Sequence, residues 1–235
     1  MRIAVLIAAV HLYIRNQSNL LFTNAGISLN HGFKPIYVIW MIIMVEMIPK
    51  FFPQKGDSIG CRKQFTSGFE PSNQKFTKSE IDNWIHLENK AAWKVFTVWF
   101  GINAMIAFGY FSKIINQPEL VLLSLFYLVC DMICILLWCP FQYLIMKNRC
   151  CVTCRIFNWD SMMVCTPLLF VPSFFSWSLV SVALVLLVRW EYSYWKHPLR
   201  FFEGSNVNLQ CKHCTEKICK VKKPFNMGHI HSRYN

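Results

Sequence analysis

The sequence predicts an all-α integral membrane protein: a small helical bundle of about four spans with an irregular polar loop and a Cys-rich tail. Three long apolar stretches, residues 95–111, 120–146 and 162–188, contain a single acidic residue and no Lys or Arg. A helix needs about 20 mainly apolar residues to cross a bilayer, because unpaired backbone groups are costly in lipid. Charged residues make up only 15% of the chain, against about 25% in soluble domains, which supports the membrane class.

Residues 1–34 are expected to form an N-terminal apolar segment followed by a linker. Arg2 precedes an apolar run over residues 3–10. A charge followed by a short apolar run is typical of a signal peptide. It is equally compatible with a short helix that lies in or partly across the bilayer, and the sequence leaves both alternatives open.

The transmembrane bundle is expected over residues 35–190, and its first span is the shortest. The apolar run 36–48 lies between Pro35 and Pro49 and carries Glu46 near its end. Its length suits a span, an interfacial segment or a re-entrant segment. Extension by Phe51 and Phe52 favours a span, with Glu46 at the depth of the lipid headgroups.

Residues 50–83 form the main polar loop, where scattered Gly, Pro, Ser and Asn give neither a helical nor a strand period. The loop ends at a helix start, because Thr77 and Glu80 have the spacing of a capping box. Apolar residues at helical spacing follow. They predict a helix that runs along the membrane surface and enters the next span near Trp93.

Prolines interrupt the two longest apolar stretches. Pro140 is expected to bend or end the helix of residues 120–146. Within residues 162–188, Pro167 and Pro172 allow two interpretations: a single kinked crossing, which the length favours, or a segment that dips into the bilayer and returns. Lys and Arg are evenly divided between the two membrane sides in the first case and strongly biased to one side in the second.

Three cysteines in five residues lie shortly after the apolar stretch 120–146. They are Cys150, Cys151 and Cys154, flanked by Arg149 and Arg155. Neighbouring cations lower the pKa of a thiol and favour the thiolate, which attacks disulfides and binds metals. Cys151 and Cys154 also have the Cys-x-x-Cys spacing that redox dithiols and half-sites for metals share.

The tail, residues 191–235, is basic and rich in Cys and His. Four soft ligands are enough for tetrahedral zinc, and cysteine groups also hold iron–sulfur clusters. The sequence therefore predicts zinc or an iron–sulfur cluster as cofactor. The predicted metal ligands of the two cysteine clusters are Cys150, Cys151, Cys154, Cys211, Cys214, Cys219, His229 and His231.

Asp131 is the only acid within the three long apolar stretches. An acid at that depth needs a partner, a proton or water, and such residues mark functional sites by default. Asp131 therefore joins Cys151 and Cys154 as a predicted catalytic residue.

The net charge of +12 resides in loops and tails that flank the apolar stretches. This placement indicates contact with the anionic headgroups of a lipid bilayer and argues against nucleic-acid binding. A further prediction is that the protein is a subunit of a membrane complex.

Three functions are compatible with these patterns. The first is a multi-pass membrane protein whose juxtamembrane cysteine clusters bind a metal, with a role in electron transfer. The second is a membrane thiol–disulfide oxidoreductase that uses Cys151 and Cys154. The third is a non-catalytic membrane scaffold in which Cys150 and Cys151 carry lipid.

Overall fold

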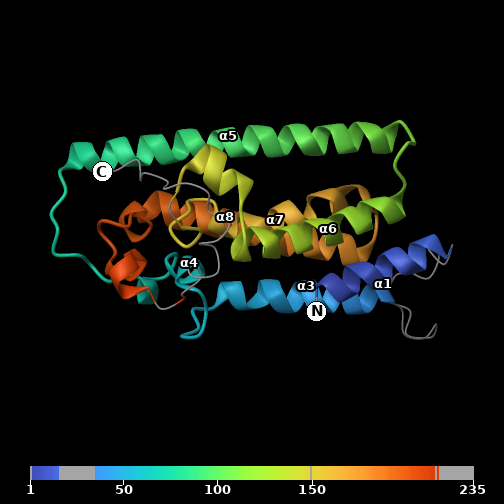
Figure 1. Cartoon of the computed structure of the whole chain (residues 1–235), viewed down its shortest axis with the longest axis horizontal. Coiled ribbons are helices and arrows are strands. Elements are labelled where there is room, and N and C mark those ends of the chain that lie inside the picture. Colours follow the sequence, from blue (N-terminus) through green and yellow to red (C-terminus); the bar gives the residue numbers. More distant parts are fainter. Residues whose placement is uncertain (1, 16–34, 149, 215, 217–235) are drawn as a thin grey trace. The chain divides into compact units, whose positions relative to one another are not determined.

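The computed structural model describes residues 2–15, 35–148, 150–214 and 216, and Figure 1 traces the helices along the chain. The described residues are all-helical, as predicted, and include no strand. The chain divides into two compact units, and each unit is made of three separate segments of the sequence. Unit 1 comprises Met1–Phe51, Phe100–Asp131 and Asp160–Leu186, and unit 2 comprises Phe52–Trp99, Met132–Trp159 and Leu187–Asn235.

Within the described ranges, three helices are long and apolar enough to cross a membrane: α5 (Lys78–Phe111), α6 (Gln117–Leu136) and α8 (Phe174–Lys196). Two further apolar helices, α1 (Arg2–Ile14) and α3 (Pro35–Met47), have 13 residues each. That is short of the roughly 20 residues of a full crossing. Membrane localisation therefore rests on α5, α6 and α8, and a fourth span at α3 stays a prediction.

Helix α5 joins the predicted surface helix and the predicted span into one element of 34 residues, about 51 Å long at 1.5 Å per residue. It begins at the expected capping box. The Thr77 N–H donates to Glu80 Oε2 at 2.7 Å, and the Glu80 N–H donates to Thr77 Oγ1 at 3.4 Å. Because the hydrocarbon core of a bilayer is about 30 Å thick, the polar N-terminal turns of α5 extend beyond it.

The prolines interrupt the helices where the sequence suggests. Helix α6 ends before Pro140, and a π-helical turn follows over Phe141–Met146. Helix α7 (Asp160–Cys165) and a 3-10 turn (Thr166–Phe170) end before Pro172, and α8 starts just after it. Residues 162–188 are therefore not one continuous helix: the long helix is Phe174–Lys196, because a proline cannot donate the backbone bond that a continuing helix requires. The choice between a kinked crossing and a re-entrant segment stays a prediction.

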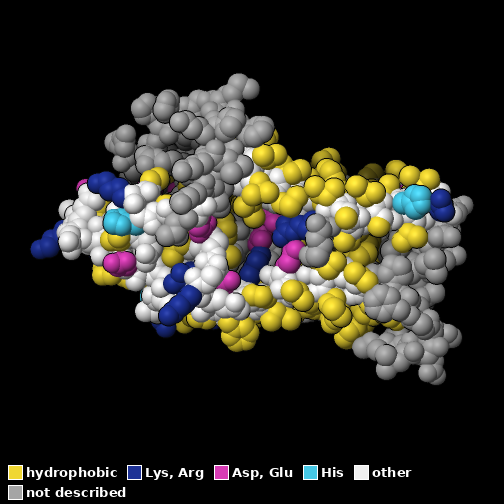
Figure 2. Space-filling model, turned by 60° about the horizontal axis from the view of Figure 1, so that its bottom comes forward, with side chains coloured by type: hydrophobic (Ala, Val, Ile, Leu, Met, Phe, Trp, Pro, Cys, Tyr) yellow, Lys and Arg dark blue, Asp and Glu magenta, His cyan; other side chains and the backbone are white. Residues whose placement is uncertain are grey.

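The two units have cores of different character. In unit 1 aliphatic side chains from several helices pack together, among them Ala9, Ile43, Leu125, Cys165 and Ala183. The core of unit 2 is aromatic and contains Trp84, Trp190, Tyr194 and Phe201. Short helix α4 (Ile59–Arg62) belongs to unit 2. Figure 2 shows a face of the protein on which hydrophobic side chains also cover much of the surface, as expected for helices that contact lipid.

Candidate functional site: a charged cluster in unit 1

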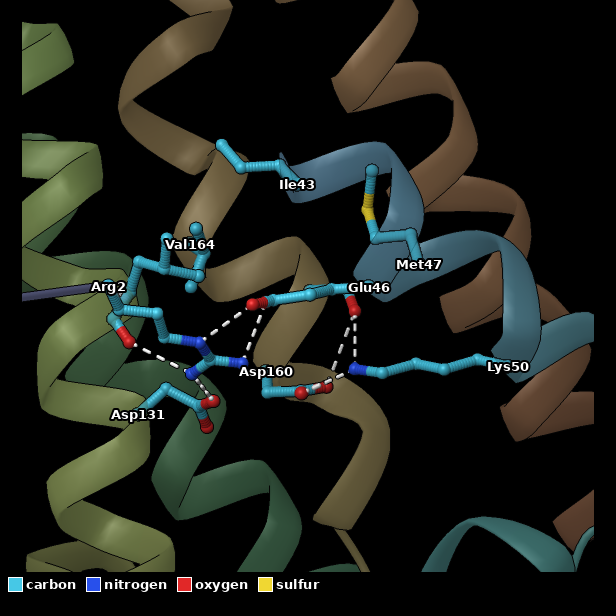
Figure 3. A pocket seen from close by; sticks show the side chains of 10 residues that line it. Arg2, Ile43, Glu46, Met47, Lys50, Asp131, Asp160 and Val164 are labelled. Atoms are coloured by element: carbon cyan, nitrogen blue, oxygen red, sulfur yellow. Dashed lines mark hydrogen bonds and ion pairs between the residues drawn. The ribbon is translucent and has the colours of Figure 1, made fainter. Parts of the chain in front are cut away.

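Five ionisable side chains of unit 1 meet beside residues of its apolar core (Figure 3). We call them the charged cluster, and they come from four segments: α1, the end of α3 with the turn after it, α6, and the start of α7. Their side chains are between 15% and 26% exposed. The charged cluster consists of Arg2, Glu46, Lys50, Asp131 and Asp160.

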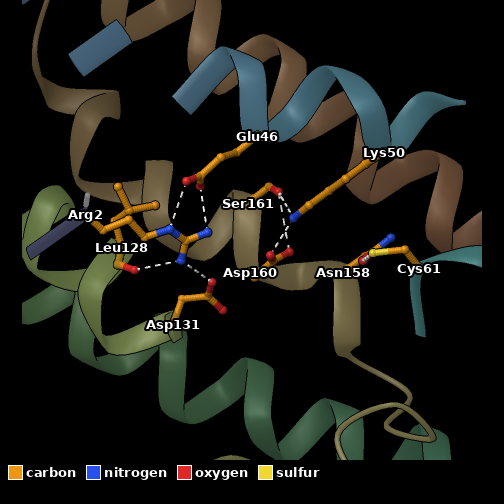
Figure 4. Close-up of polar contacts among 9 residues, drawn as sticks. All are labelled: Arg2, Glu46, Lys50, Cys61, Leu128, Asp131, Asn158, Asp160 and Ser161. Atoms are coloured by element: carbon orange, nitrogen blue, oxygen red, sulfur yellow. Dashed lines mark hydrogen bonds and ion pairs between the residues drawn. The ribbon is translucent and has the colours of Figure 1, made fainter. Parts of the chain in front are cut away.

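Arg2 is the centre of the cluster. Its Nε and Nη2 atoms donate to the two carboxylate oxygens of Glu46 at 2.9 and 2.7 Å. Its Nη1 donates to Asp131 Oδ2 and to the carbonyl oxygen of Leu128, both at 3.0 Å (Figure 4). The two parallel bonds to Glu46 form the bidentate arrangement that makes Arg–carboxylate pairs strong. Arg2 thus ties α1 to both α3 and α6.

Lys50 forms the second half of the cluster. It lies in the 3-10 turn Ile48–Phe51 that ends α3. Its Nζ donates to Asp160 Oδ2 at 2.5 Å and to Ser161 Oγ at 2.8 Å. Asp160 is the first residue of α7, where a negative charge interacts favourably with the helix dipole.

A small cavity of about 20 Å³ lies among these side chains. The five charged residues and Ser161 line it together with apolar residues of α3, α6 and α7 (Figure 3). This volume is enough for a single water molecule, and a water needs polar partners such as those present here. The cavity can therefore hold one water in contact with ionised groups.

The charges of the cluster do not balance. Two cations face three carboxylates, which leaves a net charge of −1 when all five groups are ionised. Glu46 accepts two bonds from Arg2, and Asp160 is paired with Lys50. Asp131 accepts a single bond from the guanidinium that Glu46 already occupies. Asp131 is therefore the carboxylate with the least compensating charge.

The sequence identified only part of this site. Asp131 was predicted as functional, and the structure supplies its partner, Arg2. The expected headgroup depth of Glu46 stays a prediction, and its pairing with Arg2 was not anticipated. Lys50 and Asp160 were not recognised at all. An acid in an apolar stretch calls for a cation, but nothing in the sequence shows which cation is near in space.

The cysteines of residues 150–154 lie in unit 2, on a turn in which the Cys154 N–H donates to the Cys151 carbonyl at 3.0 Å. Cys151 and Cys154 are both buried. The Cys151 thiol donates to Gln142 Oε1 at 2.9 Å. The ten cysteines in the described part of the chain form no disulfide.

Burial decides the chemistry of Cys154. It raises the pKa of the thiol to about 12, because an apolar environment disfavours the thiolate. The flanking Arg155 does not offset this, since its guanidinium pairs with Glu191 and stacks on Tyr194, 3.7 Å from the ring centre. The direction expected from the sequence, a pKa lowered by neighbouring arginines, is therefore wrong for Cys154.

Lys63 holds the cysteine turn from the interior of unit 2. It is fully buried, and its Nζ donates to the carbonyl oxygens of Val152 at 2.8 Å and Cys154 at 2.7 Å. The same Nζ lies 5.3 Å from the ring centre of Trp190 and 5.5 Å from that of Phe201. Burial lowers the pKa of Lys63 to about 8 from its ordinary value of 10.5. Nothing in the sequence points to Lys63 as a buried residue, because a lysine in a polar loop is normally exposed.

The tail cysteines are more accessible. Cys211 is exposed and Cys214 is half-buried, and the two lie at the ends of one 3-10 turn. Cys219, His229 and His231 lie outside the described residues. Within the described ranges, no three His, Cys, Asp or Glu side chains are grouped closely enough to hold a metal ion.

The geometry and charge of these groups are the grounds on which a function can be assigned. Comparison of the chain with protein-family models, with curated proteins and with solved structures finds no match.

Proposed function

We propose that this protein is a multi-pass membrane protein that binds and releases a proton at Asp131, as part of proton-coupled transport across the membrane. The observation that supports the proposal is the uncompensated negative charge of the charged cluster inside the apolar unit 1. Ionisable residues among membrane helices are costly, and they recur in the proton relays of pumps and transporters. One proton on Asp131 makes the cluster neutral.

The cluster suits a proton better than a metal cation. Arg2 and Lys50 both line the cavity, and their charges repel a second cation close by. The cavity has room for about one water, whereas a hard cation such as calcium requires six or more oxygen ligands. A proton needs only one carboxylate oxygen and a water for entry and exit.

Proton movement can be measured in sealed vesicles that contain the purified protein and a pH-sensitive dye. A potassium potential set with valinomycin drives the protons. We expect proton influx in vesicles with the wild-type protein and at least a tenfold reduction with Asp131→Asn, which keeps the shape of the side chain and removes its charge. The control is Glu119→Gln, another acid of α6, which bonds Tyr13 near the start of that helix. Influx no faster than in empty vesicles, or equal in wild type and Asp131→Asn, would contradict the proposal.

The predicted metal site in the tail is a second candidate function. It is supported by Cys211 and Cys214, which lie accessibly on one turn with the Cys-x-x-Cys spacing of a metal half-site. Cys219 and a late histidine would complete a tetrahedral site for zinc, and iron–sulfur remains the alternative. The thiol–disulfide function has less support, because Cys151 and Cys154 are buried. For the lipidated scaffold, Cys150 is the partly exposed thiol among Cys150, Cys151 and Cys154.

Metal analysis of anaerobically purified protein tests this second candidate. We expect about one zinc per chain, or iron with labile sulfide, and its loss in Cys211→Ser because one of four ligands is removed. Cys130→Ala, in α6, serves as the control that should retain the metal. Protein without metal, or metal that survives Cys211→Ser, would remove the tail site from consideration.

A further inference from the structure

The N-terminal half of α5 carries a basic face that is separate from the charged cluster. Within unit 2, the side chains of His86, Asn89, Lys90, Trp93, Lys94 and Thr97 line one open surface. His86, Lys90 and Lys94 follow one another at intervals of four residues, so they lie on adjacent turns of the same side of the helix. All three are exposed. We call this surface the basic face of α5.

Lys90 and Lys94 of the basic face have no charged partner in the part of the chain that the structure describes. No hydrogen bond or ion pair joins Lys90 or Lys94 to any residue that the structure describes. The nearby acid of the same helix, Glu88, is 2% exposed and belongs to the interior side. Like charges four residues apart destabilise a helix in isolation. Two unpaired lysines on adjacent turns therefore form a suitable place for an anion.

The position along α5 identifies the kind of anion. Lys94 directly precedes the apolar stretch 95–111, and Lys90 lies one turn earlier. Trp93 is 67% exposed on this face, and Phe96, 44% exposed, packs edge-on against it with ring centres 5.4 Å apart. Exposed Trp is typical of the membrane–water boundary, where the phosphates of phospholipids also lie. The exposed Asp82 lies two turns before Lys90, further from the apolar stretch.

We propose that the basic face of α5 binds the headgroup of an anionic phospholipid, with Lys90 and Lys94 on the phosphate and Trp93 and Phe96 against the upper part of the acyl chains. Juxtamembrane lysines are attracted electrostatically to anionic lipid headgroups. Each cation close to such a surface contributes a factor of about five in affinity. Loss of both lysines should therefore weaken binding of an anionic lipid by about 30-fold.

Native mass spectrometry of the detergent-solubilised full chain can count bound lipids directly. The protein is titrated with phosphatidylglycerol and, separately, with the zwitterionic phosphatidylcholine. We expect phosphatidylglycerol to bind the wild type more tightly than phosphatidylcholine does, and to bind Lys90→Ala/Lys94→Ala about 30-fold more weakly. Lys55→Ala/Lys75→Ala, which removes two exposed lysines outside any helix, is the matched control and should bind as wild type does.

Two further measurements keep the result unambiguous. The thermal midpoint of Lys90→Ala/Lys94→Ala should equal that of the wild type, because both side chains are exposed. Excess glycerol 3-phosphate should not displace the lipid. Equal affinity of the double variant and the wild type, equal weakening in the control, or displacement by glycerol 3-phosphate would overturn the proposal.

Discussion

Replacing Arg2 with Gln is expected to lower the free energy of unfolding by about 3 kcal/mol, because removing one partner of a buried ion pair costs roughly 3–5 kcal/mol. Arg2 is the cation that bonds both Glu46 and Asp131 in the part of the chain that the structure describes. Without it, two carboxylates of unit 1 lose their hydrogen-bond donor at once. The partial exposure of these side chains, 15–26%, places the cost at the lower end of that range.

The loss can be measured by titrating the protein in mixed micelles with a denaturing detergent and following tryptophan fluorescence. The informative comparison is with the double variant Arg2→Gln/Glu46→Gln, in which one of the two orphaned charges is also removed. It should recover at least half of the lost stability, because neutral amide groups can bond to each other without a net charge. If the single variant is as stable as wild type, or the double variant is worse than the single, Arg2 does not neutralise the cluster.

The stability of the protein should rise between pH 8 and pH 10.5 because of Lys63. The pKa of Lys63 is lowered to about 8 in the folded protein from an ordinary value of 10.5. In this pH interval the unfolded chain therefore binds more protons, so the free energy of unfolding increases with pH. Below pH 8 the lysine is charged in both states, and the full cost of the buried charge is present. The expected gain is roughly 3 kcal/mol, from about 1.4 kcal/mol per pKa unit.

The contribution of Lys63 is isolated by comparison with Lys63→Met, which fills a similar volume and does not titrate. The difference in unfolding free energy between the two proteins should change by roughly 3 kcal/mol over this interval and be flat below it. At pH 7 Lys63→Met avoids the cost of the buried charge but also lacks the donor for the carbonyl oxygens of Val152 and Cys154. The lost hydrogen bonds offset part of the stability that the variant gains. A difference that does not vary with pH would show that Lys63 is solvated rather than buried.

Much of the helical architecture could be predicted because it depends on local sequence. Most of α6 lies in the apolar stretch 120–146, the capping box at Thr77 and Glu80 starts α5, and Pro140 and Pro172 mark interruptions. The helix bounds within the third long stretch could not be predicted, because apolar composition does not distinguish α7 and the 3-10 turn after it from α8. Hydropathy reports the environment of a residue, whereas helix continuity depends on backbone donors around Pro172.

The candidate sites could be predicted only in part, because they depend on contacts between distant residues. Asp131 was recognisable as an unusual acid, but Arg2 lies 129 positions away. For Cys154 the neighbours in sequence were misleading: Arg155 follows it directly but pairs with Glu191, while Lys63 holds its carbonyl from 91 positions away. The pKa expected for the Cys154 thiol was based on its neighbours in the sequence, whereas burial determines the actual pKa.

The most direct test of the proton site is the infrared spectrum of the protein as a function of pH, since a protonated carboxylic acid has a carbonyl stretch that a carboxylate lacks. We predict a band component of this kind in the wild type that disappears as the pH is raised and that is missing in Asp131→Asn, because the other carboxyl groups of the chain contribute to both spectra and cancel in the difference between them. Glu119→Gln should retain the band. A band that persists unchanged in Asp131→Asn would contradict the assignment of the proton to Asp131.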